Sequence, residues 1–130
     1  MGPSATSATA ARVPLAMTLP QGPIDHAHLA RYTFANSELE REVLGLFAGQ
    51  APQTLAWLTS ATTAKGWRDA AHTLKGSARA VGAWQVAAAA EYAESLAQSP
   101  DTAARQSAID ALSDALEVTC AYITRLAVTA

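Results

Sequence analysis

Residues 71–78, with the sequence AHTLKGSA, hold the side chains of this chain that are best suited to chemistry. His72 supplies an imidazole, which is a good nucleophile near neutral pH. Lys75 follows three residues later and Gly76 four residues later, so a helix would bring all three to one face. Phosphoryl transfer needs positioning and cations beside the transferring oxygens more than it needs other protein chemistry. The segment therefore suits a histidine that accepts a phosphoryl group, with Lys75 beside it.

The segment from Ala64 to Val81 has the apolar spacing of an amphipathic helix. At about 100° per residue, one stripe collects Trp67, Ala71, Leu74, Ala78 and Val81. The opposite face collects Lys65, Arg68, His72, Lys75, Gly76, Arg79 and Ala83. His72 should therefore point to solvent. A helical glycine costs roughly 1 kcal/mol relative to alanine, so we expect Gly76 to provide bare backbone where another surface approaches the imidazole.

An attacking imidazole nitrogen also requires a ring held in one tautomer. A carboxylate that accepts the Nδ1 proton would leave Nε2 free to attack. The next helix offers Glu91 and Glu94, and spacing alone does not decide between them. Arg79 lies two turns beyond His72 on the same face and could meet the transferred group or a partner. A solvated lysine and solvent-exposed glutamates are the plain alternatives for Lys75, Glu91 and Glu94.

Composition points to a single helical domain of 130 residues, half of them apolar, with little strand-type alternation. A net charge of −2 argues against a nucleic-acid binder, although four of the nine basic residues surround His72 and suit an acidic partner surface.

The single cysteine, Cys120, excludes an internal disulfide, fits a reducing cytoplasm, and should pack in a helix. No apolar run is long enough for a membrane span. No phosphate-binding loop, Ser-His-Asp order or metal cluster appears, so we expect neither a nucleotide nor another cofactor.

Five helices are expected in chain order. A short helix over residues 24–32 begins at an Asp25 cap and presents His26 and His28 as two surface histidines. A long helix begins at a capping box of Ser37 and Glu40 and runs to about residue 61. This long helix should kink or break at Pro52, and its inward face should consist of Leu39, Val43, Leu46, Phe47, Leu55 and Leu58. The next helix should begin at a cap of Thr62 or Thr63 and end at Gly82, and the helix after it should begin near Trp84 with an inward face of Val86, Ala89, Ala90, Ala93 and Leu96. The last helix should begin at Ser99-Pro100 and pack through a seam of Ile109, Leu112, Leu116, Thr119, Ile123 and Leu126.

These elements predict an all-α fold, an antiparallel up-down-up-down four-helix bundle with a short additional N-terminal helix. Residues 1–23 are small, polar and proline-punctuated, so we expect a flexible leader there rather than a signal peptide. The bundle domain should then cover residues 24–127.

The sequence HTLKGSA at residues 72–78, with Gly82-Ala83 following, resembles the signature of the histidine-containing phosphotransfer (HPt) domain of bacterial phosphorelays. Ile24-Asp25 and Leu44-x-x-Phe47, followed by Pro52, Leu55 and Leu58, are also similar to the family pattern. The resemblance covers roughly residues 23–127. It departs from the family at Thr63, where an acidic residue is common, and at Ala93-Glu94, which replaces a common Leu-Glu pair.

The resemblance implies a four-helix bundle whose histidine receives a phosphoryl group from a receiver-domain aspartate and hands it on. His72 then matches the phosphorylated histidine, Lys75 the lysine beside the phosphoryl group, and Gly76 the small residue that admits the receiver. Glu94 falls where the family often bonds the histidine ring, which favours it over Glu91. The implied partners are response-regulator receiver domains and a hybrid sensor histidine kinase, with a monomeric cytoplasmic protein that has no kinase site.

Two other interpretations compete with the phosphocarrier. The phosphoacceptor module of a chemotaxis-type kinase shares the bundle and a similar histidine motif, but such modules are normally fused to dimerisation and ATP-binding domains. A non-catalytic helical adaptor would have no need for His72, Lys75 and Gly76 on one face. Replacement of His72 by glutamine separates these readings, because an adaptor would keep its function.

Overall fold

A computed structural model describes residues 22–129, which contain helices and no strands. The helices are α2 (His26–Thr33), α3 (Ser37–Ser60), α4 (Ala64–Val81), α5 (Trp84–Ser95) and α6 (Thr102–Thr129). The all-α prediction is confirmed. The predicted leader lies outside the described residues as far as residue 21. Within the described part, no helix combines the length and the apolar character needed to cross a bilayer.

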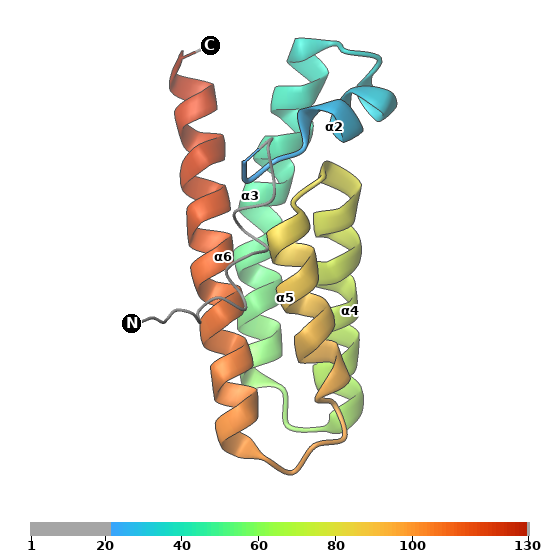
Figure 1. The fold of residues 1–130 in the computed structure, drawn as a ribbon, viewed down its shortest axis with the longest axis vertical. Helices are drawn as coiled ribbons and strands as arrows, with labels where there is room; N and C mark the ends of the chain where they lie inside the picture. The colour runs from blue at the N-terminus through green and yellow to red at the C-terminus, as the bar shows by residue number, and fades with distance from the viewer. Residues whose placement is uncertain (1–21, 130) are drawn as a thin grey trace, which may run out of the picture.

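The helices α3, α4, α5 and α6 surround a single hydrophobic core (Figure 1). Each of them packs against the next in the chain, and α6 also packs against α3. Helix α2 lies across one end of this group, against α3 and α4. The closest packing joins α4 to α5, whose inward residues Ala87, Ala90 and Ala93 are small enough to let the two backbones approach. This pair carries the candidate site.

Helix α4 begins and ends where the sequence predicts. The Thr63 hydroxyl accepts a hydrogen bond from the Gly66 backbone N–H at 3.0 Å, which satisfies one free donor of the first turn. Gly82 ends the helix in the left-handed conformation, with φ of 76°. The expected apolar stripe is buried along its whole length, from Trp67 to Val81. Local caps and one unbroken stripe therefore fix which face of α4 meets solvent.

The predicted capping box at Ser37 is wrong. Asn36 is the N-cap of α3, and its Oδ1 accepts from the Leu39 backbone N–H at 2.9 Å. Asparagine caps a helix as well as serine does, so the start moves back by one position. Glu40 then falls outside the N3 position, and its carboxylate instead accepts a hydrogen bond from the Thr33 hydroxyl of α2 at 3.2 Å.

The predicted inward face of α3 is also partly wrong. Leu44, Phe47, Ala51 and Leu58 are buried, whereas Leu39 is exposed and Leu46 is 59% exposed. The buried stripe centres on Phe47 and Ala51, and Leu46 lies more than 90° around the helix from that centre. Pro52 lies inside one continuous helix, so of the predicted alternatives, a kink or a break, the break does not occur.

The predicted Ser99-Pro100 start of the last helix is wrong as well. Asp101 takes the capping role, because its Oδ1 accepts from the Ala104 backbone N–H at 3.0 Å. The Ser99 hydroxyl instead accepts from the Asp101 backbone N–H at 3.1 Å. The predicted seam of α6 is correct, with Leu112, Leu116, Thr119 and Ile123 buried.

Helix α2 has the predicted Asp25 cap, which accepts from the His28 backbone N–H at 3.1 Å. The prediction of two surface histidines is wrong, since both are partly buried against aromatic rings. His26 Nε2 lies 2.7 Å from the Tyr122 hydroxyl of α6. The His28 ring lies 4.8 Å from the Trp84 ring, centroid to centroid. These contacts tie α2 to the end of the bundle.

Substitution of Gly82 by alanine tests the joint between α2 and the α4–α5 turn. A Cβ at Gly82 would lie 2.9 Å from the Asp25 carbonyl oxygen, and φ of 76° disfavours any L side chain. We expect Gly82→Ala to lower the free energy of unfolding by at least about 1 kcal/mol in urea titrations.

Gly45→Ala is the matched control, because a Cβ there meets nothing within 4 Å and the residue lies inside α3. It should stabilise the protein by roughly 0.5–1 kcal/mol. Equal stability of Gly82→Ala and the unmodified protein would contradict the proposed close approach of Asp25.

Candidate functional site

His72 lies near the middle of α4 with 68% of its side chain exposed. Its neighbours Ala71 and Leu74 belong to the buried stripe, so the helix itself turns the imidazole outward. The site is an open helix face rather than a cavity, as the sequence predicts. The surface of a partner protein can therefore reach this ring directly.

The carboxylate that holds the imidazole is Glu94 of α5. His72 Nδ1 lies 3.0 Å from Glu94 Oε2. Glu91, the alternative that spacing left open, lies one turn away, with Oε1 3.7 Å from Arg79 Nη2. The geometry thus favours Glu94 over Glu91 as the partner of the ring.

Lys75 binds the second oxygen of the same carboxylate. Its Nζ lies 2.6 Å from Glu94 Oε1, and only 14% of the lysine side chain is exposed. The hydrogen bond from Lys75, assisted by the one from His72, holds the pKa of Glu94 below its ordinary value against the opposing effect of partial burial. Glu94 is therefore a carboxylate at neutral pH, with one oxygen for each partner.

This arrangement selects the tautomer of His72. An ionised carboxylate can only accept hydrogen bonds, so the Nδ1 atom facing it must carry a proton. In the neutral ring, the lone pair then lies on Nε2, at the opposite side of the imidazole. Glu94 thus leaves the lone pair on the ring nitrogen that it does not bind, in a side chain that is 68% exposed.

Trp67 fixes the position of α5 beside His72, a role that the sequence analysis missed. Its buried indole Nε1–H donates to the Ala93 carbonyl at 2.6 Å, one residue before Glu94. The Arg105 guanidinium of α6 lies 4.8 Å from the Trp67 ring centroid and donates to the Ala97 carbonyl at 2.6 Å. The sequence indicates that a buried Trp67 needs a hydrogen-bond acceptor for its indole N–H. It does not indicate which carbonyl is that acceptor.

Gly76 leaves open space one turn beyond His72. A Cβ built on it would meet nothing within 4 Å. Glycine is therefore not required by packing inside the protein or by a left-handed backbone at this position. The bare backbone of Gly76 is exposed one turn from the imidazole, and no residue within 22–129 requires a glycine there.

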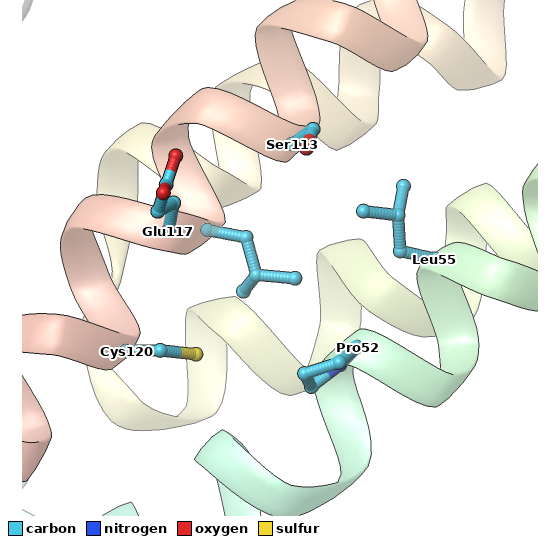
Figure 2. Close-up of a pocket in the computed structure, with 6 residues that line it drawn as sticks. Pro52, Leu55, Ser113, Glu117 and Cys120 are labelled. Atoms are coloured by element: carbon cyan, nitrogen blue, oxygen red, sulfur yellow. The ribbon is translucent and has the colours of Figure 1, made fainter.

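A hollow on the surface lies away from this face. It is a shallow groove of about 330 Å³ between α3 and α6, lined by Pro52, Leu55, Ser113, Leu116, Glu117 and Cys120 (Figure 2). Burial raises the pKa of the Cys120 thiol, which makes it a poor nucleophile. Within residues 22–129, no group of three or more potential ligands is placed to hold a metal ion.

A family model described as the Hpt domain matches residues 42–122. The matched segment covers more than half of the 130 residues and includes His72, Lys75, Gly76, Arg79 and Glu94, whereas α2 lies before it. No curated protein and no solved structure matches the chain.

Proposed function

The chain belongs to the Hpt domain family, whose members act in phosphotransfer during two-component signalling, and on this premise we propose that it is a phosphocarrier. His72 accepts a phosphoryl group from the aspartate of a receiver domain and passes it to a response regulator. The observation that supports this proposal is the exposed His72 side chain, whose Nδ1 is bonded to Glu94 and whose Nε2 is therefore the nitrogen left for reaction.

The transfer step needs no general base from this chain, because no proton has to leave Nε2. The Nε2 lone pair of His72 forms the new N–P bond while the P–O bond to the donor aspartate breaks. The aspartate leaves as a carboxylate with the electron pair of that bond. The product ring keeps its Nδ1 proton and becomes cationic, and the Glu94 carboxylate stabilises that charge through the hydrogen bond it already makes.

The partner completes the reaction centre. A receiver domain and a hybrid sensor histidine kinase are the proposed partners, and the acidic site of a receiver would meet the basic face around His72. Gly76 lets the receiver backbone approach the ring, and Arg79, which is exposed and paired with Glu91, lies beyond it. The carrier is a monomeric cytoplasmic protein without a kinase site, built on an antiparallel up-down-up-down bundle over residues 24–127.

His72→Gln tests the proposal directly. We expect it to abolish labelling by a phosphorylated receiver domain in the absence of ATP, because no other imidazole shares this geometry. The unfolding free energy should change by less than about 0.5 kcal/mol, since the side chain is exposed. The label on the unmodified protein should be acid-labile and base-stable. Normal labelling of His72→Gln would show that another residue is the acceptor, and no labelling of the folded protein by several receivers would favour an adaptor.

Gly76→Gln tests the approach of the partner. A glutamine there is compatible with the helix, so the protein should be equally stable or up to about 1 kcal/mol more stable. The rate of transfer from the receiver should fall at least about tenfold, because the side chain fills the space beside Nε2. Gly49→Gln in α3, also at an open helical glycine, is the control that should leave the rate unchanged. An unchanged rate for Gly76→Gln would remove the reason for the glycine.

A further inference from the structure

Three of the four cations on α4 are bound to carboxylates. Lys65 Nζ lies 2.6 Å from Asp69, Lys75 Nζ lies 2.6 Å from Glu94, and Arg79 lies 3.7 Å from Glu91. Arg68 is the fourth, and it makes neither a hydrogen bond nor an ion pair with any described residue, although its charge helps to lower the pKa of the adjacent Asp69. Its side chain is exposed. Arg68 is therefore the one cation of this helix that could bind a phosphoryl group without giving up an ion pair with a carboxylate.

Arg68 also lies on the correct side of His72. The two residues are four apart, so their Cβ atoms are about 6 Å from each other along one face of α4. Helical side chains lean toward the N-terminus, so the His72 side chain is expected to lean toward the turn that holds Arg68. Arg79 is seven residues away in the opposite direction, about 10 Å along the helix axis. The long arginine side chain of Arg68 can reach a group bound to Nε2.

We propose that Arg68 is a further catalytic residue, whose guanidinium binds two oxygens of the phosphoryl group on Nε2 of His72. Lys75 is then a positioning residue that acts through Glu94, because its ammonium is already held by that carboxylate and is mostly buried. This assignment rests on the proposed phosphocarrier function. Lys75 then orients the His72 ring through Glu94, and Arg68 contacts the transferred phosphoryl group.

The chemistry of the two side chains suits this division. The planar guanidinium offers parallel N–H donors that match two phosphoryl oxygens, whereas the lysine ammonium is a compact point charge. During transfer, negative charge is spread over the three oxygens that do not join the entering or leaving atom. Arg68 stabilises that charge while Glu94 stabilises the positive charge on the ring, so the two opposite charges of the product each have a partner.

A small phosphoryl donor tests Arg68 without a protein partner. With phosphoramidate, the Nε2 lone pair forms the N–P bond, the P–N bond of the donor breaks, and ammonia leaves. The rate at which phosphoramidate phosphorylates the protein is measured over a range of pH. Each rate is divided by the rate at which the same donor phosphorylates free imidazole at that pH. The ratio removes the effect of donor protonation, because that protonation changes both rates equally. We expect Arg68→Ala to lower the alkaline plateau of this ratio about tenfold, and Arg68→Lys to recover part of the loss.

Arg41→Ala is the matched control, since Arg41 is exposed on α3 and has no ion pair among the described residues. It removes the same charge and should change the plateau less than about twofold. A plateau that Arg68→Ala leaves unchanged would overturn the proposal. An effect of Arg68→Ala seen only with a receiver domain would overturn it too, because Arg68 would then be a docking contact. Loading that persists in His72→Gln would instead refute the proposed function itself.

Discussion

The site depends on one carboxylate that two helices share. Glu94 of α5 binds His72 with one oxygen and Lys75 with the other, and both partners come from α4. The bond from Lys75 lowers the pKa of Glu94, and the ionised Glu94 fixes the proton on Nδ1 of His72. The bonds also need a fixed register between α4 and α5. Trp67 provides it from the core, through its hydrogen bond to the Ala93 carbonyl.

The open face follows from the same packing. Small residues on α5 bring its backbone close to α4, which lets the short glutamate side chain reach across without burying the imidazole. His72 therefore combines a fixed tautomer with a solvent-exposed side chain. A buried catalytic histidine would give the first property but would deny access to a protein donor. The arrangement suits a group that must be offered to more than one partner.

The sequence predicted α4 well because the signals that define it are local. A threonine cap, a C-terminal glycine and one unbroken apolar stripe give both its ends and its outward face. The starts of α3 and α6 were misplaced because Asn36 and Asp101 compete with nearby serines for the same capping role. The choice between Glu91 and Glu94 could not be made from spacing, since both lie off the small-residue face and the answer depends on a contact between Trp67 and a backbone carbonyl. The burial of His26 and His28 likewise depends on Tyr122 and Trp84, which are distant in the chain.

The most direct test of the account is the protonation of the His72 ring, read by long-range proton–nitrogen NMR correlations before and after phosphorylation. We predict a neutral ring with the proton on Nδ1, and a phosphoryl group on Nε2 with that proton retained. In Glu94→Gln, the preference for the Nδ1 proton should weaken, because an amide offers a donor as well as an acceptor. A free ring protonated on Nε2, or a phosphoryl group on Nδ1, would contradict the account.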